Sequence, residues 1–415
     1  MKRLGLSALL AACLLLTSAA AKAADLHWAR SWGASPQAPT AAMGPIPPSP
    51  TFHDQTVRQV VRLSGGGRQV RIGFTNEFGT APIVVGAAHV ALAGEGGAIQ
   101  PGSDHPLTFG GKPSGVIRPG SPLLSDPVAM PVPALSKLSI SLYLPGQVDA
   151  CTCHGTGMET AYLVAGDMSG APALPGATTM IGRALVSAVD VGSDTPGRTI
   201  VTFGDSITDG VGSTLNADRR WPDRFAERLL KRGGPAVFIA NEGISGNRVL
   251  NDGFGVAALA RFDRDVLATP GLAYVIVFEG INDIGISYMP RAEGPFAAFM
   301  KTFAGTPVSA DDLIVGYKQL IARAHAHGVK IYGATITPYE GAATFSAEGE
   351  SVRQTVNAWI RKGGGFDAVL DFDAVIRDPA HPSQMKDGFH MGDHLHGSDA
   401  GYKAIADSLD LSLFR

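Results

Sequence analysis

The chain has little cysteine, little charge and, after its first residues, no long apolar run. Three cysteines in 415 residues cannot form a disulfide framework. No later segment offers the ~20 continuous apolar residues that span a membrane. Charged residues make up 17% of the sequence, the net charge is −3 and no basic tract is present, which excludes a typical nucleic-acid-binding protein. Hydrophobic residues reach 45%, which is enough to fill a core and argues against disorder.

Residues 1–24 have the pattern of a signal peptide. The first three residues carry two positive charges, an apolar stretch follows up to Leu16, and Ala21-Lys22-Ala23 matches a cleavage site between small residues. The sequence therefore predicts an exported protein, periplasmic or secreted, with a mature chain that starts at Asp25. Cys13 lies in a segment similar to a lipoprotein box, but the apolar run continues after it, which favours ordinary cleavage.

Two cysteines remain in the mature chain, Cys151 and Cys153, and one residue separates them. This spacing is compatible with two half-buried thiols or with one unusual local disulfide, which would be strained on an extended strand. His154 follows directly, but too few other ligands lie nearby to predict a metal site.

Apolar and polar side chains alternate through residues 26–191, as they do in half-buried strands. The alternation is clearest in three segments, residues 57–60, 69–74 and 137–144. Glycine-rich turns separate the segments and no convincing helix is present, so the pattern predicts a β-sandwich or jelly-roll-like domain over residues 25–195. Trp28 and Trp32 are four residues apart and are expected to share one strand face, where core packing is favoured over a sugar-stacking platform.

The pattern changes to alternating strands and helices in residues 196–415. Apolar segments predict strands at 199–203, 236–240, 273–278, 330–335 and 368–372. Amphipathic segments predict helices at 221–231, 256–267, 310–327, 347–361 and 398–411, the last with Ser398 as N-cap. Such an alternation predicts an α/β domain of three layers, α/β/α, with a parallel sheet. Ligands of these folds bind at the carboxyl ends of the strands.

Residues that can act as a nucleophile or as hydrogen-bond donors follow the first three of these strands. Ser206 lies in the segment Gly-Asp-Ser-Ile-Thr-Asp-Gly after the first strand, where it is either an exposed nucleophile or part of an ordinary turn. Asp205 beside it is expected to stabilise that turn. Gly246 follows the second strand and can bring its N–H close to a ligand. Asn282 follows the third strand, and its amide can donate a hydrogen bond towards the same cleft.

A carboxylate and an imidazole occur together near the C-terminus. Asp393 precedes His396 by three residues, so one local turn lets the carboxylate orient the ring. A serine hydroxyl needs a neighbouring base to take its proton, and histidine performs this exchange near neutral pH. Asp393 and His396 therefore complete a possible acid–base–nucleophile set with Ser206.

These four motifs, in this order, resemble the SGNH/GDSL hydrolase family over about residues 198–415. The resemblance implies Ser206 as nucleophile, His396 as general base and Asp393 as its orienting acid. It further implies an oxyanion hole made by the N–H groups of Ser206 and Gly246 and the side chain of Asn282, with no cofactor and no metal. The family often has proline after the catalytic histidine, whereas Gly397 stands here.

The β-rich half resembles the lead region of an acetylxylan-esterase-like branch of this family. The resemblance rests on residues 27–32, 56–62 and 104–111, and it implies a carbohydrate ester as substrate. Lipid, aryl or thio esters remain open, as does a carbohydrate-binding protein with an inactive hydrolase domain. Three further side chains near the motifs are candidates for substrate contact: Arg248, Glu279 and His394. For Arg248 and Glu279 a solvated ion pair at the cleft rim is the favoured alternative.

A metal-dependent hydrolase is the competing interpretation of the C-terminal motif. His390, His394 and His396 have a spacing that zinc sites tolerate, with Asp387 and Asp393 nearby. This alternative leaves the serine, glycine and asparagine motifs without a function. The sequence therefore favours an ester hydrolase that acts on a small-molecule or oligosaccharide ester, without nucleic acid and without a membrane span. The oligomeric state is left open.

Overall fold

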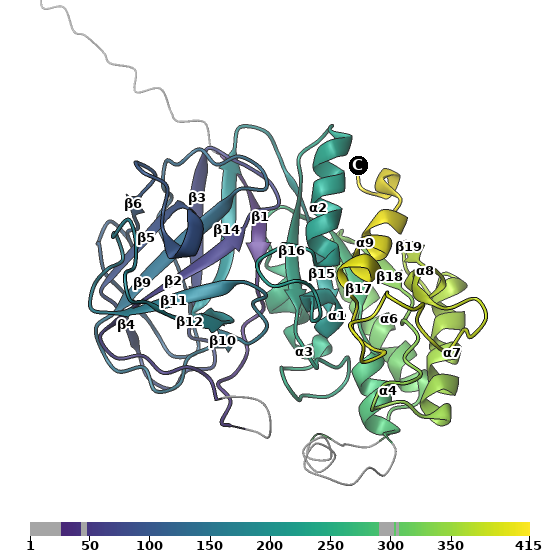
Figure 1. Cartoon of the computed structure of the whole chain (residues 1–415). Coiled ribbons are helices and arrows are strands. Elements are labelled where there is room, and N and C mark those ends of the chain that lie inside the picture. The colour runs from purple at the N-terminus through teal and green to yellow at the C-terminus, as the bar shows by residue number, and fades with distance from the viewer. Residues whose placement is uncertain (1–25, 43–47, 290–302, 304–306) are drawn as a thin grey trace, which may run out of the picture.

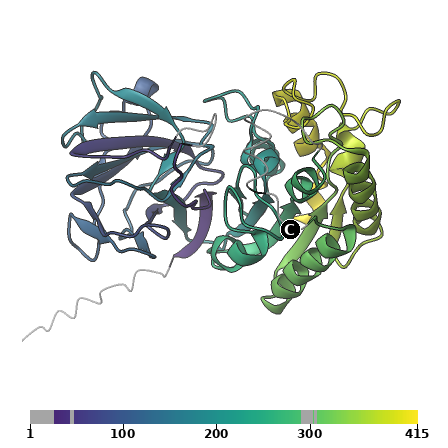
Figure 2. The same ribbon diagram turned by 90° about the horizontal axis from the view of Figure 1, so that it is seen from below.

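The computed structural model describes residues 26–42, 48–289, 303 and 307–415, so the predicted signal peptide lies outside the described residues. Two hydrophobic cores lie side by side, one in the β-rich half and one around a parallel sheet (Figures 1 and 2). The predicted boundary after residue 195 falls in the connection between the two halves. Among the described residues, no helix has the length and apolar character needed to cross a membrane.

Two antiparallel sheets form the β-rich half. One has the order β1 (His27–Gly33), β14 (Val186–Ser193), β3 (Gln69–Thr75), β8 (Pro122–Leu124). The other has the order β12 (Thr178–Ile181), β11 (Thr160–Ala165), β2 (Gln55–Arg62), β9 (Lys137–Leu144), β5 (Ala87–Leu92), β6 (His105–Pro106). Two small sheets pair β4 (Ile83–Val85) with β7 (Gly115–Ile117) and β10 (Cys153–His154) with β13 (Arg183–Ala184). Apolar side chains of both large sheets share one core, which confirms the predicted sandwich.

The expectation that Trp28 and Trp32 share a strand face is wrong. The register of β1 against β14 shifts between Arg30 and Trp32, as a β-bulge does. The extra residue changes the phase of the alternation, so Ala29 and Trp32 both enter the core. Trp28 instead lies half-buried beneath the guanidinium of Arg71, 4.3 Å from the ring centroid.

A five-stranded parallel sheet forms the centre of the second half, as predicted. Its order is β16 (Val237–Gly243), β15 (Arg198–Gly204), β17 (Leu272–Phe278), β18 (Lys330–Ala334), β19 (Ala368–Leu370). β15 is buried along both faces after Arg198, which explains why Ile200, Val201 and Phe203 do not alternate with exposed polar residues. Because β15 lies between β16 and β17, the three motifs that follow these strands in the sequence meet at one edge of the sheet.

Helices cover the two faces of the parallel sheet (Figure 1). One group contains α2 (Trp221–Arg232), α8 (Phe372–Ile376) and α9 (Asp399–Ser408), and the other contains α3 (Ala258–Phe262), α4 (Ile281–Ser287), α6 (Ala310–Ala326) and α7 (Ala347–Arg361). Ser398 caps α9 by accepting a hydrogen bond from the N–H of Gly401, as predicted.

Four local differences from the predicted elements occur in this half. The segment predicted as one helix at 256–267 is α3 followed by a π-helical turn, η2 (Asp263–Leu267). The strand predicted at 368–372 ends at Leu370, where Asp371 caps α8. Helix α4 was not predicted, because the loop-forming residues Gly280 and Asn282 hide its start. The helix predicted at 398–411 ends at Ser408, before the short helix η3 (Leu411–Leu413).

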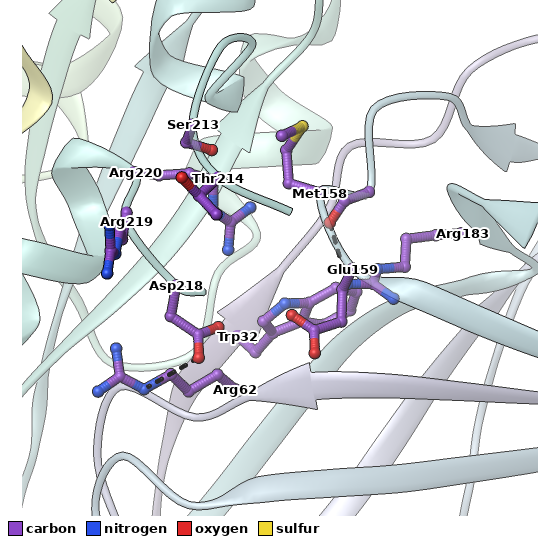
Figure 3. A pocket seen from close by; sticks show the side chains of 11 residues that line it. Trp32, Arg62, Met158, Glu159, Arg183, Ser213, Thr214, Asp218, Arg219 and Arg220 are labelled. Carbon is purple, nitrogen blue, oxygen red and sulfur yellow. Dashed lines mark hydrogen bonds and ion pairs between the residues drawn. The ribbon is translucent and has the colours of Figure 1, made fainter. Parts of the chain in front are cut away.

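The two halves are joined by side chains that cross between them. Phe238 of β16 is part of the core of the β-rich half. Ser64 Oγ accepts from the N–H of Ile239 and donates to its carbonyl oxygen, at 2.8 and 3.0 Å. A polar cavity of about 10 Å³ lies at the same junction and is lined by residues of both halves, among them Arg62, Arg183 and Asp218 (Figure 3). Its volume is enough for about one water molecule and too small for a substrate.

Candidate active site

Ser206 lies at the carboxyl end of β15, where the chain enters the short helix α1 (Ser206–Asp209). Asp205 caps this helix, because its Oδ1 accepts a hydrogen bond from the N–H of Ile207 at 3.0 Å. Asp205 therefore stabilises the turn, as expected. As the first residue of the helix, Ser206 has an N–H without an acceptor inside α1. A hydroxyl and a backbone donor thus lie together at the end of the sheet.

The Ser206 hydroxyl is hydrogen-bonded to His396. His396 Nε2 lies 2.8 Å from Ser206 Oγ, and His396 Nδ1 lies 2.6 Å from Asp393 Oδ2. An ionised carboxylate only accepts hydrogen bonds, so Nδ1 carries the proton and Nε2 of the neutral ring faces the hydroxyl as acceptor. The structure thus brings together three side chains that the sequence predicts to act as a set, although 190 positions separate the serine from the histidine.

Asp393 is held in a tight turn that orients its carboxylate. Its Oδ1 accepts hydrogen bonds from the N–H groups of Leu395 and His396, at 3.1 and 3.0 Å. Partial burial opposes the ionisation of Asp393, but the hydrogen bonds from His396 outweigh it and hold the pKa of the Asp393 carboxyl well below its usual range. The carboxylate is therefore ionised at neutral and mildly acidic pH.

The other two histidines of this loop contact each other rather than the serine. The ring centroids of His390 and His394 lie 4.2 Å apart. His390 Nδ1 accepts a hydrogen bond from the N–H of Gly392 at 3.1 Å, so this nitrogen is occupied within the loop. Within the described part of the chain, no group of three or more His, Cys, Asp or Glu side chains is arranged to hold a metal ion. The metal interpretation of the three histidines therefore gains no support from the geometry.

Two hydrogen-bond donors follow the strands on either side of β15. Gly246, after β16, has φ +78°, and a Cβ there would lie 2.3 Å from the ring of Phe254, so the position requires glycine. Asn282 lies in the first turn of α4, after β17. Its Nδ2 donates to the carbonyl oxygen of Asn247 at 3.0 Å, which leaves the second amide hydrogen for another acceptor. The predicted donors are thus attached to neighbouring strands.

Asp283 joins these two motifs, a role that the sequence reading missed. Its carboxylate accepts hydrogen bonds from the N–H groups of Val249 and Leu250, at 2.7 and 3.1 Å. It therefore fixes the loop after β16 to the start of α4, and with it the relative positions of Gly246 and Asn282. The adjacency of Asp283 to Asn282 in the sequence was the available signal, but an aspartate in a loop is too common to interpret alone.

The interpretation of Arg248 and Glu279 as a solvated ion pair at the cleft rim is wrong. Arg248 is buried, and its guanidinium donates to the carbonyl oxygens of Phe303 and Asp252, so it connects Phe303 to the loop after β16. The side chain of Glu279 is completely buried and lies 3.6 Å from Arg261. Glu279 cannot contact a substrate from this position. Contact of His394 with substrate stays a prediction, because its side chain is half-buried.

Three carboxyl groups near the catalytic motif, those of Asp205, Asp283 and Glu279, are buried and interact with one another electrostatically. Burial raises the pKa of Asp205 to about 7 and that of Asp283 to about 6. Burial also raises the pKa of Glu279 well above its usual range, despite the nearby charge of Arg261. Each group therefore binds its proton more tightly in the folded chain than in the unfolded chain, where aspartate and glutamate titrate near pH 4.

Thermal stability is expected to fall as the pH rises from 5 to 8. Unfolding then releases protons from the buried carboxyl groups, so the free energy of unfolding decreases across this window. We expect the wild-type Tm to be lower at pH 8 by at least about 3 °C, measured by calorimetry. Asp205→Asn retains the capping oxygen and removes one of the titrating groups, so its Tm should change less. The same decrease in both proteins would contradict the assignment to Asp205.

The family model for the GDSL-like lipase/acylhydrolase family matches residues 202–404 of this chain. No curated protein matches the chain. Solved structures with a similar fold include an acetyl xylan esterase from Geobacillus stearothermophilus (21% identity, 51% of this chain and 92% of that one, TM-score 0.38). A second is a lipase/acylhydrolase from Enterococcus faecalis (18% identity, 51% of this chain and 92% of that one, TM-score 0.37). A third is an aryl esterase from M. smegmatis (17% identity, 50% of this chain and 94% of that one, TM-score 0.37).

These structures are too distant to inform the substrate of this chain. The family model, in contrast, covers Ser206, Gly246, Asn282, Asp393 and His396 together. The strand ends that carry the first three of these residues and the loop that carries the last two belong to one parallel-sheet fold. The second half of the chain thus matches the GDSL-like lipase/acylhydrolase family over residues 202–404.

Proposed function

We propose that the chain is a serine ester hydrolase that works through a covalent acyl-enzyme. The observation that carries this proposal is the unbroken hydrogen-bond chain from Asp393 through His396 to Ser206. A base within 2.8 Å of the hydroxyl, itself oriented by a carboxylate, is the arrangement that activates a serine nucleophile. The match to an acylhydrolase family supports the same reaction class.

The geometry assigns each group a step in the reaction. Ser206 Oγ attacks the ester carbonyl while His396 Nε2 takes the hydroxyl proton, and Asp393 stabilises the imidazolium that forms. His396 then gives this proton to the leaving alcohol, which leaves the acyl group on Ser206. Water attacks the acyl-enzyme with His396 again as base, and the acid is released. The N–H groups of Ser206 and Gly246 and the Asn282 amide are proposed to bind the oxyanion in both steps.

The proposed substrates are carbohydrate esters, with acetyl groups foremost. This assignment is supported by the resemblance of residues 27–32, 56–62 and 104–111 to the lead region of acetylxylan-esterase-like proteins. We also propose that the mature chain, from Asp25, is exported. Residues 1–24 have the pattern of a signal peptide, and acetylated polysaccharides lie outside the cell.

A fluorophosphonate probe and a substrate panel test the proposal in sequence. We expect the probe to label wild-type protein at Ser206 and to leave Ser206→Ala unlabelled. A folded wild-type protein without labelling would instead support a carbohydrate-binding protein. With labelling established, faster hydrolysis of acetylated xylo-oligosaccharides than of long-chain acyl, aryl or thio esters supports the carbohydrate assignment. The reverse preference makes the chain a lipase, arylesterase or thioesterase.

Asn282→Asp is expected to lower kcat by about 10²–10³-fold with little change in KM. The substitution keeps the shape of the side chain but removes both amide hydrogens, so the oxyanion loses a donor and gains a nearby negative charge. Steady-state kinetics on p-nitrophenyl acetate measure the effect. An unchanged kcat in a folded variant would show that Asn282 does not contact the oxyanion.

A further inference from the structure

A short segment of the β-rich half, residues 151–157, lies against the catalytic motif of the hydrolase half. Cys151 and Cys153 form a disulfide, with their Cα atoms 5.5 Å apart. Cys153 exchanges two backbone hydrogen bonds with Gln37, and β10 pairs with β13 through Ala184 and Arg183. Contacts within the β-rich half therefore fix the backbone at His154, whose side chain points to the hydrolase half.

His154 is buried, at 5% exposure, and both of its ring nitrogens face acceptors. Its Nδ1 lies 2.9 Å from the carbonyl oxygen of Ser35, and its Nε2 lies 3.0 Å from Asp209 Oδ1. A carbonyl oxygen and a carboxylate cannot donate, so the ring has to donate from both nitrogens, as an imidazolium does. Burial opposes this charged form, but the Asp209 carboxylate outweighs it, and the net pKa of His154 is raised.

Asp209 connects His154 to the loop that carries Gly246, because its two carboxylate oxygens bind different partners. Its second oxygen, Oδ2, accepts hydrogen bonds from the N–H and the Oγ of Ser245, at 2.9 and 2.7 Å. Ser245 directly precedes Gly246, so the carboxylate holds the residue whose carbonyl group forms the peptide bond with the Gly246 nitrogen. Asp209 is also the last residue of α1, the helix that begins with Ser206. It thus links the nucleophile helix to the oxyanion loop.

A second contact from the same segment reaches the same loop. Thr156 Oγ1 lies 2.7 Å from Ser245 Oγ. Gln37, which binds Cys153, also donates from Nε2 to the carbonyl oxygen of Phe254 at 2.8 Å. The ring of Phe254 is the group that a Cβ at Gly246 would meet. The β-rich half therefore holds the oxyanion loop through Ser245 on one side and Phe254 on the other.

We propose that His154 of the β-rich half is a positioning residue for the oxyanion hole, acting through Asp209 and Ser245 on the Gly246 N–H. The inference rests on the proposed function and adds to it that the hydrolase half has an incomplete active site without the β-rich half. A donor displaced from the oxyanion affects the transition state more than the bound ester. The displacement is therefore expected to appear in kcat rather than in KM.

The test compares His154→Ala with His89→Ala in the full-length chain. His89 is a matched control, because it also pairs with an aspartate (Nδ1 to Asp104 Oδ2, 2.8 Å) in the β-rich half, away from Asp209. We expect His154→Ala to lower kcat about 10- to 100-fold with KM within about threefold, because misplacement by about 1 Å can cost 10²-fold. The rate of fluorophosphonate labelling of Ser206 should fall in parallel. His89→Ala should retain the wild-type kcat.

A double-mutant cycle with Ser245→Ala tests whether the effect passes through Ser245. We expect the second substitution to lower kcat less in the His154→Ala background than in the wild type, because both act on one hydrogen-bond chain. Additive effects, an unchanged kcat in folded His154→Ala, or equal losses in His154→Ala and His89→Ala would each overturn the proposal. A wild-type chain without esterase activity or labelling would instead refute the proposed function.

Thr156→Val provides a milder variant if His154→Ala does not fold. Thr156 is half-buried, and valine has nearly the same shape, so the substitution removes only the hydroxyl that contacts Ser245. We expect a loss of about 2- to 10-fold in kcat with unchanged KM, which corresponds to one hydrogen bond of ordinary strength. If the Thr156→Val protein keeps the wild-type kcat while His154→Ala is unfolded, the segment only stabilises the fold and the proposal fails.

Discussion

Replacement of Ser206 by alanine is expected to lower kcat by about 10⁶-fold, the loss typical when a serine hydrolase loses its nucleophile. His396 would then have no hydroxyl to activate, and no acyl-enzyme can form. The fold should be retained, since the change removes one oxygen atom from a turn whose cap is provided by Asp205. The residual rate over water would come from the oxyanion hole and substrate binding alone.

The measurement is steady-state hydrolysis of p-nitrophenyl acetate by purified Ser206→Ala, with Tm determined on the same samples. Ser139→Ala is the matched control, because Ser139 is a buried serine of β9 whose Oγ has no hydrogen-bond partner among the described residues. It should keep the wild-type kcat. Substantial turnover by folded Ser206→Ala would exclude Ser206 as the nucleophile and with it the proposed mechanism.

Asp393→Asn is expected to lower kcat by about 10⁴-fold near neutral pH, although the geometry of the loop should be nearly unchanged. Asparagine can still accept the N–H groups of Leu395 and His396 through its oxygen. Its amide nitrogen would then face His396 Nδ1 and donate to it, which places the ring proton on Nε2. A ring with a proton on Nε2 cannot take the hydroxyl proton of Ser206.

Asp378→Asn is the control for this second prediction. Asp378 also precedes its histidine partner, His381, by three residues, and the two side chains are 3.3 Å apart. Its replacement should leave kcat unchanged because neither residue reaches Ser206. Equal effects of the two substitutions on kcat, or a wild-type rate for Asp393→Asn, would show that Asp393 does not orient His396.

Much of the fold could be predicted because it is encoded by local periodicity. The alternation at residues 137–144 coincides with β9, and the amphipathic segment 347–361 coincides with α7. In each case the side chains that face a core repeat with the period of the element itself. The boundary errors fall where capping residues interrupt this period, as Asp371 does at the end of β19.

The wrong interpretations concern distances and burial that no local pattern encodes. The spacing of Trp28 and Trp32 predicts one shared strand face, because a bulge such as the one in β1 cannot be recognised from spacing alone. The charges of Arg248 and Glu279 predict a solvated position at the cleft rim, because charged side chains are usually exposed to solvent. Their burial depends on residues distant in the chain, since Arg248 binds the carbonyl oxygen of Phe303 and Glu279 lies beside Arg261 of α3.

The sequence by itself determined the class of each half, the strand ends that bear Ser206, Gly246 and Asn282, and the pairing of Asp393 with His396. These features depend on residues close together in the chain or on the general rule that parallel strands end at one edge. Only the tertiary structure decided that His396 reaches Ser206 and that His154 reaches Asp209, because each contact needs two distant segments to meet within about 3 Å. Such contacts form only when both hydrophobic cores are packed, so no single segment of the sequence predicts them.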